Sequence, residues 1–367
     1  MSKQFRQIGF DQLSGWDNDD HLAAMGAFLK TAQRMLETPY QTKELAVSSD
    51  HLLAISKLAV QNLPFDAQSA KLFFEENFIP CEITNEVENS PTSSGFVTAY
   101  FEPEVLASRA KSAAFSAPLY QRPNDLIDVT DDNRPTLWDE EFRFAKFTTN
   151  KNAQQLETYP DRAQINNGYL DGKGLEIAYV KDKAEALFIH IQGSARLRLE
   201  DGNVIRVGYA AKTGHPYTAV GKILLDRGEL TRENCGMKAI RDWFSSNPEQ
   251  MNSVIEKNQS YIFFNEYAVL DLNDGPIGAS KVALTTERSL AVDRTLHTYG
   301  TPIWIETQEP LPGCSQLFQK LMVAQDTGSA IIGPQRGDLF LGSGDEAGKI
   351  AGDTRHHARF VVFLPKI

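Results

Sequence analysis

The sequence predicts a mainly β protein with peripheral helices, built from two β modules of which one is inserted into the other. Two observations predict this fold class. Helical periodicity dominates the first ninety or so residues, and it returns only between two groups of short apolar segments. The last 110 or so residues contain short strand-like segments joined by glycine-rich loops, which is typical of a small closed barrel.

The composition is that of a globular protein with more than one hydrophobic core. The chain has 367 residues, of which 41% are hydrophobic. The formal net charge of −11 argues against a nucleic-acid-binding protein, which would present a basic face. The three widely spaced cysteines include no Cys-x-x-Cys pair, which argues against a zinc ribbon and allows at most one disulfide.

The N-terminal residues match no targeting segment. They lack an apolar stretch with a small-residue cleavage site, and no run of 18 apolar residues occurs elsewhere. From the residues alone, a cytoplasmic protein and an exported protein whose signal segment has been removed are both open.

The first third of the chain contains three predicted helices followed by a strand. Apolar residues recur at helical spacing over residues 19–38 and 48–63, and Asp66 is a plausible cap for a third helix. Residues 95–103 form an aromatic, β-favouring segment that stops at a proline. Residues 104–170 are rich in Pro, Asn, Asp and Arg, and we expect irregular structure there.

The middle of the chain predicts a sheet followed by helices. Asp201-Gly202 is a strong hairpin signal within an expected antiparallel meander. The four strands of this meander are expected at residues 175–180, 186–192, 195–199 and 204–209. Helices are expected at residues 216–228, from Thr231 through Phe244, and from Pro248. The last six strands are expected at residues 261–265, 288–293, 301–306, 321–327, 338–341 and 359–364.

Two aspartates lie at the ends of two predicted strands that a Gly/Pro-rich loop connects. Asp326 follows an apolar run, and Asp338 enters the next one. Such positions are rigid yet reachable by a substrate, which suits acid–base chemistry. Asp293 and Asp345 lie in similar surroundings. Each alone is as well explained as a loop-bracing carboxylate, but together the four predict a general acid or base.

Several other motifs are weaker than they look. Asp326-Thr-Gly resembles an aspartic peptidase motif, but that chemistry needs two such carboxylates and no second copy is present. The glycines at 342–348 have the wrong spacing for a nucleotide loop. His356-His357 lacks a third metal ligand, and His215 is as plausible in stabilising a turn as in binding a substrate.

Six collinear motifs resemble those of the membrane-bound lytic murein transglycosylase A (MltA) family. The clearest spans Met322–Gly348 and is similar to the "3D" motif region of that family. The others are Thr98–Pro103, His190–Arg196, Val207–Thr218, Gly275–Ala279 and Arg288–Asp293.

The resemblance implies a double-psi β-barrel with N-terminal helices, formed by residues 1–103 and 241–367. It implies an inserted β domain at residues 104–240 and a groove between the two domains that binds a glycan strand. It further implies a periplasmic monomer, associated with the outer membrane through a lipid anchor that this chain does not show.

The implied activity is that of a lytic transglycosylase, a carbon–oxygen lyase that cleaves the β-1,4 bond between N-acetylmuramic acid and N-acetylglucosamine in peptidoglycan. The catalytic acid falls on Asp338, with Asp326 and Asp293 lining or supporting the site, and the reaction requires no metal or organic cofactor. Residues expected to bind the glycan are Thr98, Tyr100, Gln192, Ser194, Arg196, Tyr209, Lys212, His215, Tyr217, Gly328 and Arg336.

Two other functions stay open. One is a hydrolase acting on the same or a related β-1,4 glycan, with Asp293 or Asp326 as the base. The other is a non-catalytic glycan-binding barrel of the expansin type.

Overall fold

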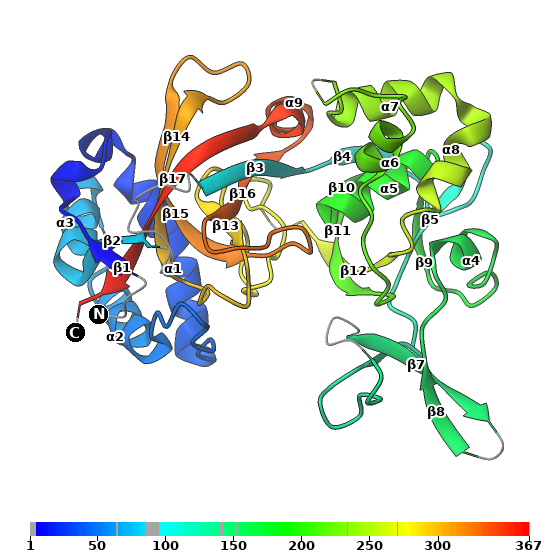
Figure 1. Ribbon diagram of the computed structural model, residues 1–367, viewed down its shortest axis with the longest axis horizontal. Coiled ribbons are helices and arrows are strands. Elements are labelled where there is room, and N and C mark those ends of the chain that lie inside the picture. Colours follow the sequence, from blue (N-terminus) through cyan, green and yellow to red (C-terminus); the bar gives the residue numbers. More distant parts are fainter. Residues whose placement is uncertain are drawn as a thin grey trace. The chain divides into compact units, whose positions relative to one another are not determined.

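The structure is a computed structural model that describes residues 5–63, 65–84, 95–138, 143–150, 153–232, 234–269 and 271–366. The chain divides into two compact units, whose elements are labelled in Figure 1. Unit 1 comprises Met1–Phe101 and Asp271–Ile367, and unit 2 comprises Glu102–Leu270. Unit 2 is therefore inserted, in sequence, into unit 1.

Unit 1 carries three helices where the apolar periodicity predicts them. The side chains of Asp20, Ser48 and Asp66 each accept a hydrogen bond from a first-turn backbone N–H, which caps the three helices. The fully buried side chains of Met25 and Phe28 lie on the first helix, which packs against strand β15 (Leu317–Asp326). The N-terminal elements are β1 (Phe5–Gln7), η1 (Phe10–Gln12), η2 (Trp16–Asn18), α1 (His21–Glu37), α2 (Ser49–Gln61) and α3 (Ala67–Asn77).

Six strands of unit 1 close into a barrel. They pair in the order β17-β14-β15-β13-β16-β3, and β3 pairs again with β17, which closes the ring. The closed barrel is the architecture that the strand pattern predicts, whereas the double-psi connectivity stays a prediction. The six strands are β3 (Gly95–Glu102), β13 (Ser289–Val292), β14 (Pro302–Pro310), β15 (Leu317–Asp326), β16 (Arg336–Ser343) and β17 (Arg355–Pro365). β2 (Phe78–Ile83) and β1 extend the sheet beside β17, and α9 (Asp345–Asp353) follows β16.

One strand expected in the barrel lies in unit 2. The segment predicted at residues 261–265 is β12 (Ile262–Ala268), which pairs with β11 (Val204–Lys212). β3 takes the sixth place in the barrel instead. An apolar pattern predicts that a strand exists, but it does not identify the distant strand that supplies its hydrogen bonds.

Unit 2 contains three small sheets among the described residues. The hairpin predicted at Asp201-Gly202 is confirmed, and it joins β10 (Ser194–Leu199) to β11. β12 adds to β11 antiparallel, and β4 (Glu104–Ala107) adds to β10 parallel. The other two sheets pair β5 (Ala117–Tyr120) with β9 (Glu176–Val180), and β6 (Ile127–Asp128) with β7 (Phe144–Asn150) and β8 (Ala153–Glu157).

The expected four-stranded antiparallel meander is wrong, because only residues 195–199 and 204–209 pair with each other, as β10 and β11, and residues 175–180 form β9, which pairs with β5. Residues 186–192 belong to a helix, α5 (Lys183–Gln192), which the Asp182 side chain caps and Gly193 ends at a φ of 76°. The five consecutive residues from Ala186 to His190 are all buried. A helix that is buried on every side shows no apolar stripe, so its sequence looks like that of an interior strand.

One further expectation for unit 2 needs correction. Most of the described part of residues 104–170 is irregular, as expected, although this segment also contains β4 through β8 and α4 (Arg162–Asn166). The helices that follow are α6 (Val220–Asp226), α7 (Met237–Ser246) and α8 (Pro248–Ile255). Only α8 begins where predicted, with its proline in the first turn. α7 begins at Met237 rather than Thr231.

The boundaries of the units differ from the expected domain boundaries mainly at the second crossing. The first crossing, between Phe101 and Glu102, lies two residues before the expected one. The second lies near residue 270 instead of 240, because α8 packs on α5 and β12 pairs with β11. All three cysteines are free thiols. Within the described residues, no helix combines the length and apolar character needed to cross a bilayer.

Candidate active site

The two aspartates that the sequence singles out flank strand β13. Asp326 is the last residue of β15, and Asp338 is the third residue of β16. Both pair with Ala291, Asp326 from the parallel side and Asp338 from the antiparallel side. Neighbouring strands lie about 4.8 Å apart, so the two aspartate Cα atoms are separated by roughly 10 Å. Residues opposite one another share a face, and the small Ala291 methyl group leaves room between the two carboxyl groups.

Asp338 is half-buried and has the properties of a general acid. The Thr98 hydroxyl donates a hydrogen bond to Asp338 Oδ1 at 2.5 Å, and Arg336 Nη2 donates to Thr98 Oγ1 at 2.7 Å. Burial raises the pKa of Asp338 to about 6, and the negative charge of Asp326 adds to the rise. The Thr98 hydrogen bond and the Arg336 charge oppose it. A substantial fraction of Asp338 is therefore protonated in weakly acidic solution.

Asp326 is also half-buried, but it is surrounded by hydrogen-bond donors. The Tyr100 hydroxyl donates to Oδ2 at 2.7 Å, and the backbone N–H of Ala279 donates to Oδ1 at 3.0 Å. Burial raises the pKa of Asp326, while these bonds and one from the backbone of Thr327 limit the rise. Hydrogen bonds to a carboxylate favour its ionised form, so the donors around Asp326 act against the effect of burial. The pair thus combines a carboxyl group with a pKa of about 6 and a second carboxyl group held by hydrogen-bond donors.

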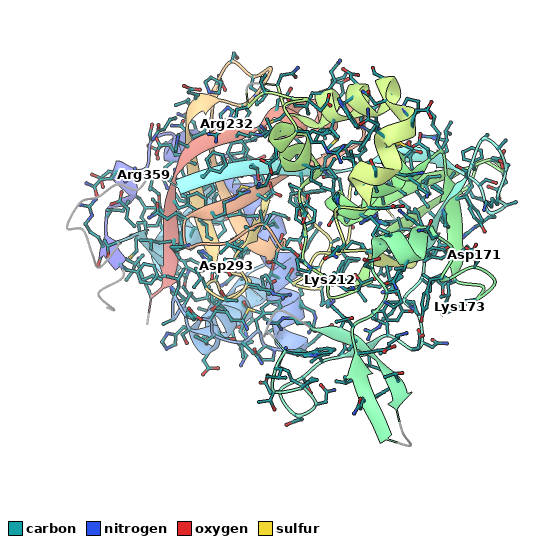
Figure 2. All side chains as sticks on the ribbon, turned by 45° about the vertical axis from the view of Figure 1, so that its right-hand side comes forward. Asp171, Lys173, Lys212, Arg232, Asp293 and Arg359 are labelled. Carbon is teal, nitrogen blue, oxygen red and sulfur yellow. The ribbon has the colours of Figure 1, made fainter. Side chains whose placement is uncertain are left out.

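Asp293, labelled in Figure 2, braces the loop that connects the other two aspartates. Its Oδ1 accepts hydrogen bonds from the backbone and hydroxyl of Thr295, and its Oδ2 accepts one from the Gly333 N–H at 2.8 Å. Burial opposes ionisation, yet these bonds lower the pKa of Asp293 below its usual value. These contacts favour the loop-bracing interpretation over a role as acid or base.

The same loop has a second anchor that sequence reasoning missed. The Nε2 of His297 lies 2.9 Å from the carbonyl oxygen of Pro334, to which it donates, and the His297 ring is almost completely buried. The sequence feature that could have identified this anchor is the spacing of four residues between Asp293 and His297. The His297 N–H donates to the Asp293 carbonyl oxygen, as in one turn of a helix. Gly328, at the start of the loop, is exposed, so a ligand can reach its backbone.

Two of the predicted glycan-binding residues in unit 2 lie in its interior. Ser194 and Arg196 are 5% and 6% exposed on β10. Arg196 Nε donates to Glu102 at 2.8 Å, and Arg206 donates to both carboxylate oxygens of the same fully buried Glu102. This arrangement favours a structural role for Arg196. Gln192 ends α5 and is half-buried.

The remaining predicted residues of unit 2 lie nearer its surface. Tyr209 and Tyr217 are 47% and 38% exposed as whole residues, and an aromatic side chain near the surface is of the type that stacks on sugars. Lys212, labelled in Figure 2, ends β11 and is half-buried. His215 Nε2 lies 2.6 Å from the carbonyl oxygen of Tyr159, which favours the turn-stabilising interpretation.

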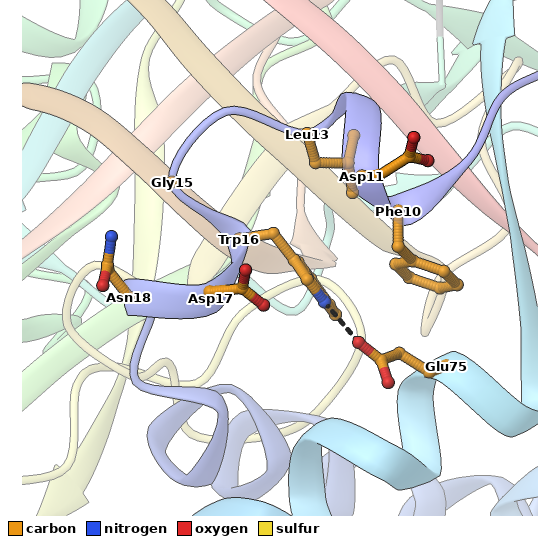
Figure 3. A pocket seen from close by; sticks show the side chains of 8 residues that line it. All are labelled: Phe10, Asp11, Leu13, Gly15, Trp16, Asp17, Asn18 and Glu75. Atoms are coloured by element: carbon orange, nitrogen blue, oxygen red, sulfur yellow. Dashed lines mark hydrogen bonds between the residues drawn. The ribbon is translucent and has the colours of Figure 1, made fainter.

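A separate hollow of about 270 Å³ lies among the N-terminal elements of unit 1 (Figure 3). The buried Trp16 indole donates to Glu75 Oε1 at 2.8 Å across it, and Lys71 holds Asp17 in an ion pair that lowers its pKa. Glu75 and Asp17 thus have hydrogen-bonding partners, and the pKa of Asp17 is shifted in the direction opposite to that of a proton donor. Nor do the described residues contain three or more His, Cys, Asp or Glu side chains arranged to hold a metal ion.

Two segments of the chain match known protein families. Residues 96–265 match the MltA specific insert domain, and residues 288–364 match the 3D domain. The class of protein is therefore a 3D-domain barrel that carries an inserted second domain.

Individual relatives agree with this class. The chain is 30% identical over 271 residues to membrane-bound lytic murein transglycosylase A of Vibrio cholerae and 31% identical over 269 residues to that of Escherichia coli K12. These matches cover 71% of this chain, and the chain spans 63% of the length of both relatives.

Solved structures match over nearly the whole chain. A membrane-bound lytic murein transglycosylase from Agrobacterium tumefaciens is 39% identical with a TM-score of 0.89, covering 99% of this chain and 98% of that one. MltA from Neisseria gonorrhoeae is 29% identical with a TM-score of 0.80, covering 98% and 92%. The chain belongs to the membrane-bound lytic murein transglycosylase A family.

Proposed function

We propose that this protein is a lytic transglycosylase that cleaves the β-1,4 bond between N-acetylmuramic acid and N-acetylglucosamine in peptidoglycan. The bond is broken without water, and the muramic acid end closes to a 1,6-anhydro ring. The observation that carries the proposal is the half-buried Asp338, whose pKa is raised to about 6 by burial and by the nearby Asp326. The names of the relatives support the same substrate class.

In the first step, the Asp338 carboxyl group donates its proton to the glycosidic oxygen. The bond from that oxygen to C1 of the muramic acid breaks, the N-acetylglucosamine leaves with a 4-hydroxyl group, and positive charge develops at C1. A carboxyl group with a pKa near the working pH is suited to this transfer. The nearby carboxylate of Asp326 stabilises the positive charge electrostatically.

In the second step, the Asp338 carboxylate removes the proton from the 6-hydroxyl of the same muramic acid. The 6-oxygen then bonds to C1 and forms the anhydro ring, and Asp338 is again protonated. The attacking oxygen belongs to the reacting sugar, so proximity replaces an external nucleophile or an activated water. One residue therefore acts as acid and then as base, and no second catalytic carboxylate needs to attack.

The supporting residues have distinct roles in this proposal. Thr98 and Arg336 orient Asp338 and limit its pKa, and Tyr100 holds Asp326. Tyr209 and Tyr217 present exposed rings to sugar faces. A peptidoglycan substrate supports a location in the periplasm, and the names of the relatives support attachment to a membrane. The groove expected between the two domains stays a prediction.

The test is mass spectrometry of the products released from purified sacculi by the parent protein and by Asp338→Asn. The parent should release anhydro-muropeptides, and the variant should release them at least about 100-fold more slowly, since a general acid contributes that much or more. Asp345→Asn, which changes an exposed aspartate in the first turn of α9, is the matched control and should keep the parental rate. Parental activity in Asp338→Asn contradicts the proposal.

The same spectra separate the alternative functions. A hydrolase would release reducing ends that are heavier than the anhydro ends by one water. A non-catalytic glycan-binding barrel would bind sacculi and release neither product. Anhydro ends from the parent exclude both alternatives.

A further inference from the structure

A lysine beside the candidate site has a backbone conformation that usually belongs to glycine. Lys281 has a φ of +66°, in the left-handed region that an L-residue with a side chain rarely adopts. Among the described residues, only Ala46 and Glu287 are other non-glycine residues with positive φ. Such a conformation costs free energy, and where it persists it often marks a functional position.

The conformation follows from a tight turn. The Lys281 N–H donates to the carbonyl oxygen of Gly278 at 2.9 Å, and the Gly278 N–H donates to Val282 at 2.9 Å. Ile277 and Ala283 pair antiparallel on either side. A hairpin turn of this type requires a left-handed residue at its last position, where glycine is the usual choice. The chain has a lysine there instead.

The turn is fixed to the end of β15 that carries Asp326. The N–H of Ala279 donates to Asp326 Oδ1 at 3.0 Å, and the N–H of Ser280 donates to the Gln325 carbonyl oxygen at 3.0 Å. The Tyr40 hydroxyl donates to the Ser280 carbonyl oxygen at 2.7 Å and holds the turn from a third element. Lys281 follows Ser280 and lies two residues after Ala279, whose N–H contacts Asp326 directly. The position of the Lys281 backbone is therefore fixed relative to Asp326.

The Lys281 side chain brings a positive charge to the edge of the site. The residue is exposed, and no hydrogen bond or ion pair occupies its ammonium group within the described part of the chain. Burial is the main influence on Asp326 and raises its pKa, while the Lys281 charge acts in the opposite direction. The positive charge of the ammonium group thus affects the pKa of Asp326, but the two groups do not form an ion pair.

We propose that Lys281 binds a carboxylate of the glycan substrate, so that the site prefers anionic muramyl glycans to neutral glycans of the same length. The inference rests on the proposed function and deepens it, because N-acetylmuramic acid carries a lactyl ether that N-acetylglucosamine lacks. That ether ends in a carboxylate when the glycan has no peptide, and in peptide carboxylates when it has one. The ammonium group of Lys281 supplies the matching charge, and this contact offsets the cost of the backbone conformation.

The test is calorimetric binding in an Asp338→Asn background, in which the glycan is not cleaved. Three probes are used: a peptide-free muramyl glycan with free lactyl carboxylates, the same glycan after amidation of those carboxylates, and the peptide-bearing glycan. Lys281→Gly should weaken binding of a carboxylate-bearing probe about 3- to 10-fold and leave binding of the amidated glycan unchanged. Loss on the peptide-free glycan assigns the contact to the lactyl group, and loss on the peptide-bearing glycan alone assigns it to the peptide. The preference should diminish as salt rises, because the charge is exposed.

Two further variants distinguish the effect of the Lys281 charge from the effect of its backbone conformation. Lys281→Arg keeps the charge and should keep the preference. Ala46→Gly relieves the same backbone conformation at an exposed position in another segment of the unit. Both glycine variants should melt about 2 °C higher than the parent, but only Lys281→Gly should lose the preference for anionic glycans.

The inference is overturned if Lys281→Gly weakens the amidated and anionic glycans equally, or if it weakens neither. Failure of the proposed function has a different signature, since a parent protein that releases reducing ends is a hydrolase whether or not Lys281 selects anionic glycans. Anhydro products together with an unchanged preference in Lys281→Gly would remove the inference alone.

Discussion

Replacing Thr98 by valine should move the pH dependence of the reaction to higher pH. The Thr98 hydroxyl donates to Asp338 Oδ1 at 2.5 Å, and this bond favours the ionised carboxylate. A hydrogen bond to a charged group contributes about 1.5–3 kcal/mol, and 1.36 kcal/mol corresponds to one pKa unit. Because Asp338 is half-buried, solvent recovers part of this, and we expect the pKa of Asp338 to rise by about one unit, from about 6 to about 7.

The assay is the pH profile of kcat/KM on a soluble glycan. Activity requires a protonated Asp338, so it falls as pH rises through the pKa of that group. In Thr98→Val this fall should occur about one unit higher than in the parent, with a lower maximum because the carboxyl group is less well oriented. Thr98→Ser keeps the hydroxyl group and should keep the parental profile. An unchanged or acid-shifted fall in Thr98→Val would refute the assigned hydrogen bond and its effect on the acid.

Three other predictions concern stability. Asp338→Asn should stabilise the protein by about 1–3 kcal/mol above pH 6 and should have no effect on stability below pH 4. The reason is that a carboxyl group whose folded-state pKa is raised to about 6 destabilises the fold once it ionises. Thermal melts across this pH range test the prediction. Asp293→Ala should cost about 2–3 kcal/mol at neutral pH by leaving the Gly333 N–H without its acceptor, and Asp293→Asn should cost less. Both costs should shrink as the pH falls through the lowered pKa of folded Asp293, and melting temperatures equal to that of the parent at pH 7 would contradict the brace. Glu102→Gln should lower the stability of the fold by about 3–5 kcal/mol, because it leaves the buried Arg196 and Arg206 without a compensating charge. The control, Glu266→Gln, removes a more exposed ion pair and should cost less than about 1 kcal/mol. Similar costs for the two variants in denaturant titrations would count against this account.

The sequence predicts the barrel better than it predicts unit 2. β13 through β17 are found by pattern alone, because they are short apolar segments between glycine-rich turns. β12 shows the limit of this reasoning, because its pattern is that of a strand but does not show that its partner is β11 in unit 2 rather than a strand of the barrel. α5 shows another limit, because its five consecutive buried residues, Ala186 to His190, hide the helical stripe that distinguishes a helix from an interior strand.

The sequence predicts which carboxylates form the candidate site, but not the residues that surround them. Strand ends followed by glycine-rich loops identify Asp326 and Asp338, but the shared partner Ala291 depends on strand order, which no local pattern contains. The donors that distinguish their roles include a backbone N–H of Ala279, which has no sequence signature. Arg196 was expected to face the glycan, yet the structure buries it against Glu102, because a motif match does not report burial.

The most direct test of the central claim is digestion of peptidoglycan in water enriched in oxygen-18. The account holds that the 6-hydroxyl of the muramic acid, and not water, attacks C1. It therefore predicts anhydro ends that contain no oxygen-18 and an equal number of unlabelled 4-hydroxyl ends. Reducing muramic acid ends that carry oxygen-18 at C1, formed at the rate of bond cleavage, would contradict it.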